Sequence, residues 1–217
     1  MTVETLYATK HARGMLPRGL IEWLKIDIEP VDPNEKYDEF KTHFPLGKSP
    51  AFLGSNGFEL TEVLAILSYL VNLKGDVELE KTLYGSALEE RSQVIRILSF
   101  VNQEIALSFI ALISAVKTSA SQEVYDEKLA QLLGCFAFLE QRLTQQEFLV
   151  NDHITIADLY AAAVCGLLFK SVLGKDRTAG FSLLEKWLPK VLQHPALMGR
   201  LDTSESLEKT VSLPSAN

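Results

Sequence analysis

The sequence predicts two domains of different classes, a small mixed α/β domain followed by an all-helical domain. Short apolar segments alternate with helical patterns up to about residue 75. Beyond about residue 87, apolar residues recur only at helical spacing. A chain of 217 residues with 47% hydrophobic content can bury a sizeable core in one or two domains. We therefore predict domains at 1–75 and 87–201, and a tail at 202–217.

The charge balance argues against one class of function. The chain carries 21 Lys and Arg against 28 Asp and Glu, a formal net charge of −7. Proteins bind nucleic acid through clustered Lys and Arg that neutralise phosphates. We therefore expect no direct binding to nucleic acid.

The sequence shows no signal for secretion or for a membrane. Residues 1–5 lack the charged and apolar regions of a signal peptide. No apolar run reaches the roughly 18 residues that a membrane span requires, and the best candidate, Ile154–Phe169, carries Asp158. Cys135 and Cys165 lie in apolar helical patterns and form no CxxC motif, which indicates buried free thiols in a reducing compartment. We expect a cytoplasmic protein that does not enter a membrane.

The first domain reads as βαβα followed by ββα. In chain order, the expected elements are a strand at 5–8, a helix that begins at Pro17, a strand at 25–31, a helical segment at 32–45 with Tyr37 and Phe40 on one face, a strand at 51–53, a turn at 54–57, a strand at 58–61 and a helix from 61 to about 74. Pro suits the first turn of a helix, and Asn-Gly is a strong hairpin signal. This order of elements is typical of a thioredoxin-like domain.

The segment from Ser49 to Glu62 has the properties of a ligand site. Ser49 precedes Pro50 and is therefore held extended. Thr61 offers an oxygen for capping the next helix, and Glu62 is expected in its first turn. An extended edge can pair with the backbone of a peptide-like ligand, a helix start can bind its carboxylate, and Glu62 can bind its ammonium group. The alternative is that these residues only shape the turn and cap the helix.

The second domain is predicted to be a helical bundle. After a polar connection from 74 to about 87, one long helix reaches Val116, and a second follows a Ser/Thr-rich loop at 117–122. The buried face of the first is predicted to hold Val94, Ile95, Leu98, Val101 and Ile105, and that of the second Leu129, Leu132, Leu133, Phe136, Leu139 and Leu143. Thr155 and Asp158 form a predicted capping box before a helix that is apolar on every side and is expected to be the domain core.

These motifs carry a resemblance. The segment Gly47–Phe52, followed by Leu60-Thr61-Glu62 and Ala65-Ile66, is similar to the glutathione-binding half of the glutathione transferase family. The capping box extends the resemblance from about residue 5 to about residue 200. In that family the proline is cis, the residue before it pairs with the cysteinyl backbone of glutathione, and a Glu-Ser pair holds the γ-glutamyl end. Here Val63 replaces that serine.

The resemblance implies that glutathione is a ligand or co-substrate, bound by Lys48, Ser49, Pro50, Thr61 and Glu62. Lys48 would meet the glycyl carboxylate, unless it is simply an exposed turn lysine.

An active transferase also needs a group that stabilises the glutathione thiolate. Family members use a Tyr at the end of the first strand, or a Ser or Cys before the first helix, but residues 13–16 contain neither Ser nor Cys. The catalytic candidates are Tyr7, which could instead be a packing residue, and Arg13, which could instead be solvated. His43, His153 and His194 have no partners at metal-ligand spacing, so we expect no metal site.

A narrower resemblance leaves two functions open. The blocks Thr5–Ala8, Ala12–Gly14, Pro17–Leu20 and Phe44–Leu46 look like the N-terminal domain of the elongation factor 1 gamma family, especially its fungal forms. That resemblance implies a scaffold or interaction module linked to translation elongation, with other elongation factor subunits as partners. The alternative is an active glutathione S-transferase that conjugates or reduces electrophiles. Both imply a homodimer.

Overall fold

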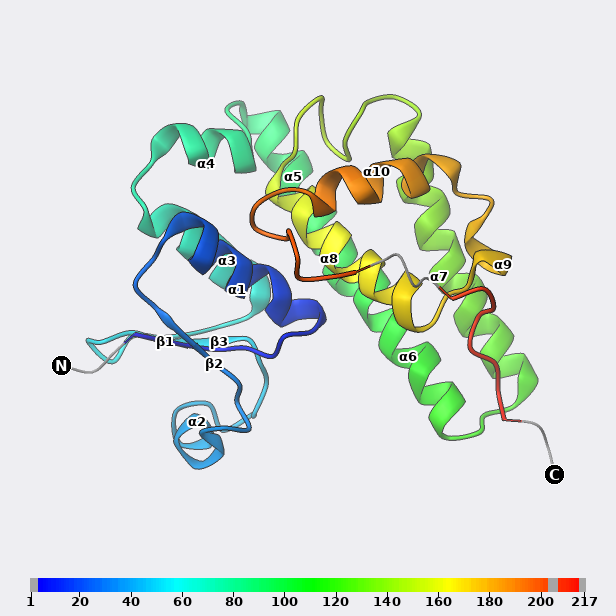
Figure 1. Cartoon of the computed structure of the whole chain (residues 1–217), viewed down its shortest axis with the longest axis horizontal. Helices are drawn as coiled ribbons and strands as arrows, with labels where there is room; N and C mark the ends of the chain where they lie inside the picture. Colours follow the sequence, from blue (N-terminus) through cyan, green and yellow to red (C-terminus); the bar gives the residue numbers. More distant parts are fainter. Residues whose placement is uncertain (1–3, 203–206, 215–217) are drawn as a thin grey trace.

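The computed structural model describes residues 4–202 and 207–214 and shows two domains side by side, one built on a sheet and one all helical (Figure 1). The first domain is a four-stranded sheet of β1 (Thr5–Tyr7), β2 (Glu29–Val31), β3 (Ala51–Leu53) and β4 (Glu59–Thr61). Helices α1 (Ala12–Leu24) and α3 (Val63–Leu73) cover one face, and α2 (Tyr37–His43) lies on the other (Figure 1). The predicted thioredoxin-like domain is confirmed.

The strand order in the sheet is β2-β1-β3-β4. β1 pairs in parallel with β2, and α1 connects the two strands. β1 also pairs antiparallel with β3, where Tyr7 lies opposite Ala51. β3 and β4 form the predicted hairpin, with Ala51 opposite Thr61. Because Ser49 and Pro50 directly precede β3, this register places them near the residues that end β4.

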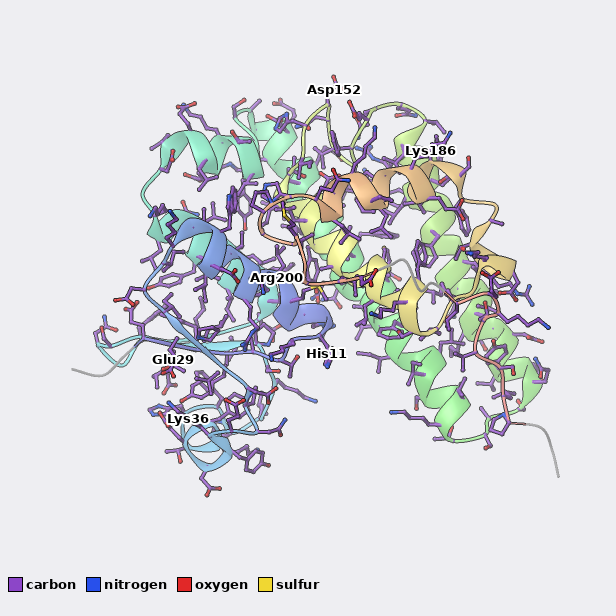
Figure 2. All side chains as sticks on the ribbon, in the orientation of Figure 1. His11, Glu29, Lys36, Asp152, Lys186 and Arg200 are labelled. Atoms are coloured by element: carbon purple, nitrogen blue, oxygen red, sulfur yellow. The ribbon has the colours of Figure 1, made fainter. Side chains whose placement is uncertain are left out.

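Helix α1 differs from its predicted start. It begins at Ala12, so Pro17 lies inside the helix, where its missing N–H removes only one hydrogen bond. The Pro-Arg-Gly-Leu block has a clear structural role. Arg18 donates to the carbonyl of Ala8 at 2.8 Å, and Gly19 lies so close to the second domain that a Cβ there would be 1.8 Å from the Ala196 oxygen. Figure 2 shows Arg200 beside α1, where it contacts Glu22.

Two other elements of the first domain are shorter than predicted. β2 covers only Glu29–Val31, because Lys25 takes a left-handed conformation (φ 52°) that closes the end of α1. α2 begins at Tyr37 rather than near Asp32. Phe40 on this helix is buried, whereas Tyr37, at its first residue, is 56% exposed.

The helical part of the chain differs from the prediction in two places. The polar connection holds the helix α4 (Val77–Tyr84), which Asp76 caps by accepting from the N–H groups of Glu78 and Leu79. The first long helix is continuous but consists of α5 (Leu88–Phe100), a π-helical turn η1 (Val101–Ile105) and α6 (Ala106–Lys117). Its face is buried as predicted except at Ile95, which is 52% exposed.

Among the described residues, Leu88–Lys117 is the one helix that length and composition alone would allow to cross a membrane, whereas Ile154–Phe169 was the best candidate in the sequence. It packs against the helices α7 (Gln122–Leu143) and α8 (Ile156–Ser171), as core helices of a folded domain do.

Helix α8 is the centre of the structure. Its residues from 156 to 166 are all buried, and it contacts α1, α5, η1 and α10 (Ser182–Leu192). The predicted capping box is present. Because α1 belongs to the first domain, one continuous hydrophobic core joins the two domains.

The Asp158 carboxylate does more than cap α8. It accepts from Thr155 N–H at 3.0 Å and Thr155 Oγ1 at 2.7 Å, and also from Leu149 N–H at 2.8 Å and Trp187 Nε1 at 3.1 Å. Burial raises the pKa of Asp158, and the four donors oppose that rise. The carboxylate thus ties α8 to the preceding loop and to α10.

Part of the predicted tail is bound to the helical domain. Leu207 accepts from the N–H of Lys175 in α9 (Lys175–Thr178), Thr210 donates to Asp176 at 2.8 Å, and the Tyr125 hydroxyl donates to the Val211 carbonyl at 2.7 Å. The segment 207–214 therefore packs across α7 and α9 as part of the fold.

Replacing Asp158 by Ala should lower the free energy of unfolding by about 3 kcal/mol or more, because each of four buried donors left unpaired costs ~1–3 kcal/mol. Thr155→Ala should cost only about 1–2 kcal/mol. Urea unfolding followed by tryptophan fluorescence measures both. Asp152→Ala is the control, since Asp152 is exposed on the preceding loop (Figure 2). Equal losses for all three variants would contradict this role of Asp158.

Candidate ligand-binding site

A cavity of about 270 Å³ lies where the two domains meet. Its lining consists of Arg13, Lys48, Ser49, Pro50, Thr61, Glu62, Val63 and Asn102. The structure therefore brings together all five residues predicted to bind glutathione, together with Arg13. Tyr7 is not part of this lining.

The edge at Ser49 is available for pairing. The Ser49–Pro50 bond is cis, and Pro50 is buried while Ser49 is half-buried. No hydrogen bond from the rest of the described chain reaches the main chain of Ser49. A peptide-like ligand could therefore pair with both its N–H and its C=O groups.

Glu62 lies at the start of α3 in an unusual conformation. Its φ of 69° is in a region that residues other than Gly rarely adopt. Such a backbone usually persists only where surrounding structure or function requires it. Glu62 occupies the N-cap position, and no side chain caps the helix, so the prediction that Thr61 is the cap was wrong. The reason is that Thr61 still belongs to β4, in register with Ala51.

Several polar groups near the start of α3 are therefore available to a ligand. The Thr61 hydroxyl, the Glu62 carboxylate and the Lys48 ammonium group are all on exposed residues, and none has a side-chain partner within the described ranges. A second cavity of about 270 Å³, lined also by Phe44, Pro45 and Leu46, adjoins the same three residues. Lys48, Thr61 and Glu62 thus present a cation, a hydroxyl and an anion beside a free helix start.

Arg13 and Asn102 complete the cavity from the direction of the helical domain. Arg13 belongs to α1, whose first residues point toward that domain, as the position of His11 in Figure 2 shows. Its Nη2 donates to the Asn102 carbonyl at 3.3 Å, while its Nε is enclosed without a partner among the described groups. Asn102 lies in η1 and accepts a hydrogen bond from the Tyr160 hydroxyl at 3.0 Å.

Tyr7 lies in a separate cluster. Its ring is fully buried and packs against Phe40 and Phe44, with ring centroids 5.3 and 6.0 Å away. Burial, reinforced by the nearby Glu39 carboxylate, raises the pKa of Tyr7 to about 12. The geometry does not support a catalytic role for Tyr7, because its hydroxyl lies in this cluster, away from the cavity. It supports the alternative that Tyr7 is a packing residue.

The histidines of the described chain also have other roles. His43 pairs with Glu59 at 2.8 Å, and His153 contacts the Thr82 carbonyl at 3.0 Å. No group of three metal-binding side chains occurs among the described residues.

Sequence reasoning did not find Asn102, although a signal was present. Asn102 lies four residues after Leu98 and eight after Val94, so helical spacing places it on the buried face of the long helix. A polar residue at such a position needs a partner. Tyr160 is that partner, and it was predicted only as part of an apolar core helix.

The fold and this cavity define a class of protein: a thioredoxin-like domain with a cavity beside a cis-proline, supported by a helical domain. Two family models match the chain, "Glutathione S-transferase, N-terminal domain" over residues 1–72 and "Glutathione S-transferase, C-terminal domain" over residues 86–195. The chain belongs to the glutathione S-transferase family.

Individual relatives within this family are similar to nearly the whole chain. Elongation factor 1-gamma 1 of Saccharomyces cerevisiae is 31% identical over 99% of this chain and 52% of its own length. The crystal structure of the GST-like domain of elongation factor 1-gamma from the same yeast has a TM-score of 0.89 at 30% identity, covering 99% of this chain and all of that domain. Glutathione S-transferase Y-2 of Pichia kudriavzevii is 29% identical over 91% of this chain and 98% of its length. This chain spans about half the length of the first two curated relatives that it matches.

Proposed function

We propose that this protein binds glutathione in the cavity between Ser49, Glu62 and Asn102, and acts as an interaction module linked to translation elongation. The observation that supports this most is the set of unpaired groups around the cis-proline: the Ser49 main chain, the Thr61 hydroxyl, the Glu62 carboxylate and the Lys48 ammonium group. Their charges complement those of glutathione.

The residues fit the ligand group by group. The extended Ser49 main chain would pair with the cysteinyl backbone of glutathione. The Glu62 carboxylate would bind the γ-glutamyl ammonium group, and the first N–H groups of α3, with the Thr61 hydroxyl, would bind the adjoining carboxylate. Lys48 would bind the glycyl carboxylate. Val63 is 3% exposed and contributes only its backbone N–H.

The link to translation comes from the relatives. Those named elongation factor 1-gamma match nearly the whole chain, and the solved GST-like domain has the same architecture throughout. We infer that other elongation factor subunits are the partners and that the protein acts in the cytoplasm. Cys135 and Cys165 are free, as suits a reducing compartment.

A homodimer forms part of the proposal. A depression of about 320 Å³ lies between α3, α4 and α5, lined by residues that include Leu64, Tyr84 and Ile95. Around it, Leu88 is 77% and Ile95 is 52% exposed. Exposed apolar side chains gathered around a depression favour a protein contact.

Glu62→Gln should weaken glutathione binding roughly 10- to 100-fold, because it removes the charge of the one carboxylate among the described residues that line the cavity. Isothermal titration calorimetry measures this. Glu123→Gln is a matched control, since Glu123 is exposed in the first turn of α7, outside the cavity lining. Wild-type protein that binds no glutathione, or equal affinity in Glu62→Gln, would contradict the proposed ligand.

A second candidate function is glutathione transfer to electrophiles. The guanidinium of Arg13, whose Nε has no partner among the described groups, favours it, because a positive charge in the cavity would stabilise a thiolate. In a conjugation assay with a generic aromatic electrophile, Arg13→Ala should then lower turnover about tenfold or more, whereas Tyr7→Phe should not change it. If the wild-type rate equals the uncatalysed rate, the transferase function is rejected and the interaction module remains as the proposed function.

The dimer is tested separately. Combining Leu88→Asp with Ile95→Asp should convert the dimer into a monomer, because charges would be buried in the contact. Sedimentation velocity measures the change, and Ile110→Asp is the control, since Ile110 is similarly exposed on α6. A wild-type monomer, or an unchanged dimer in the double variant, would contradict the proposed surface.

A further inference from the structure

Two residues with donor groups line the cavity from outside the predicted ligand segment. One is Arg13 on α1, and the other is Asn102 on η1. No carboxylate forms an ion pair with Arg13 in the described part of the chain, and its enclosed Nε has no hydrogen-bond partner there. Arg13 is half-buried, and an enclosed N–H group without a partner is costly unless an anion or water satisfies it. This wall of the cavity is therefore suited to negative charge.

Tyr160 fixes the orientation of the Asn102 side-chain amide. Its hydroxyl lies 3.0 Å from Asn102 Oδ1 and donates to it, which leaves Nδ2 without a partner among the described residues. Tyr160 is fully buried in α8, so it cannot move without disturbing the core. Burial raises the pKa of Tyr160 to about 12, although the Arg13 charge opposes this, so the hydroxyl keeps its proton near neutral pH.

The backbone supports the same arrangement. Asn102 lies in the only π-helical turn of residues 4–202 and 207–214. Such turns often occur at functional sites, because they change the direction of side chains in a helix. The main-chain carbonyl of Asn102 accepts from Arg13 Nη2 at 3.3 Å, so one residue both orients the guanidinium and supplies the second donor.

We propose that Arg13 and the Nδ2 group of Asn102 form the subsite that holds the glutathione sulfur as a thiolate, with Tyr160 as the positioning residue for Asn102. This inference rests on the proposed function, since glutathione must bind in the cavity. On binding, the thiol loses its proton to water, and the resulting anion accepts hydrogen bonds from the two donors. Thiolate stabilisation then comes from α1 and the helical domain, without a hydroxyl from β1 or from the loop that follows it.

The other ionisable groups around the cavity have compensating charges. Lys48 before β3 favours the thiolate, and Glu62 before α3 opposes it. Tyr160 on α8 is neutral, and Tyr7 lies in the cluster with Phe40 and Phe44. Arg13 therefore supplies the charge and Asn102 the neutral donor. Removing either should shift the titration of the bound glutathione thiol.

The test measures the pKa of the bound glutathione thiol from its ultraviolet thiolate absorbance, on the whole protein. In the wild type this pKa should lie about one to two units below that of free glutathione. Asn102→Ala should raise it by about one unit, a tenfold loss of thiolate at neutral pH, and Arg13→Ala should raise it at least as much. Calorimetry with S-methylglutathione, which has no thiol proton, should give equal affinity in all these proteins.

Tyr160→Phe distinguishes positioning from general destabilisation. It keeps the buried ring but releases the amide of Asn102, so the thiol pKa should rise while S-methylglutathione still binds. Tyr125→Phe is the matched control, because it removes another buried hydroxyl, one that bonds the Val211 carbonyl outside the cavity. It should leave the thiol pKa unchanged.

The outcomes separate the two proposals. If S-methylglutathione binds but the thiol pKa equals that of free glutathione, or does not respond to Asn102→Ala and Arg13→Ala, the sulfur subsite is wrong and the proposed function stands. If neither glutathione nor S-methylglutathione binds the wild type, the proposed function fails and the subsite fails with it. If Tyr125→Phe shifts the thiol pKa as much as Tyr160→Phe does, the positioning role of Tyr160 is wrong.

Discussion

The structure depends on a buried carboxylate. Asp158 is fully buried yet accepts four hydrogen bonds, from the loop before α8, from the capping residue and from Trp187 on α10. A charge without partners at this position would cost several kcal/mol, roughly as much as a small domain's margin of stability. With its donors in place, it holds α8 in one position. Because α8 packs against α1, the orientation of the two domains follows from this interaction.

The site is a consequence of that packing. The first domain alone supplies Ser49, Thr61 and Glu62 on one connected segment. The cavity is complete only where α1 meets η1, because Arg13 and Asn102 come from different domains. Gly19 permits the approach of the 194–200 segment to α1, where any Cβ would overlap the Ala196 carbonyl. The residues that join the domains therefore also determine the shape of the ligand site.

The free groups of the cavity explain how one fold can serve two functions. Pairing with a peptide backbone and binding its charged ends requires only the segment around the cis-proline, which this chain retains. Conjugation also requires a thiolate, and here the groups available for stabilising one are Arg13 and Asn102 rather than Tyr7.

The sequence by itself determined what depends on neighbours along the chain. The Ser49–Pro50 edge, the hairpin before Thr61, the Thr155–Asp158 box and the apolar periodicity of the long helices follow from local sterics and hydrogen bonding, and the fold class follows from their order. Tertiary structure alone decided the rest. Whether Tyr7 faces the ligand or the core depends on which side of the sheet α2 covers. Asp158 binds Leu149 and Trp187, which lie 9 and 29 positions away in the sequence, and Asn102 binds Tyr160, 58 positions away. Packing, and not sequence spacing, makes these residues neighbours.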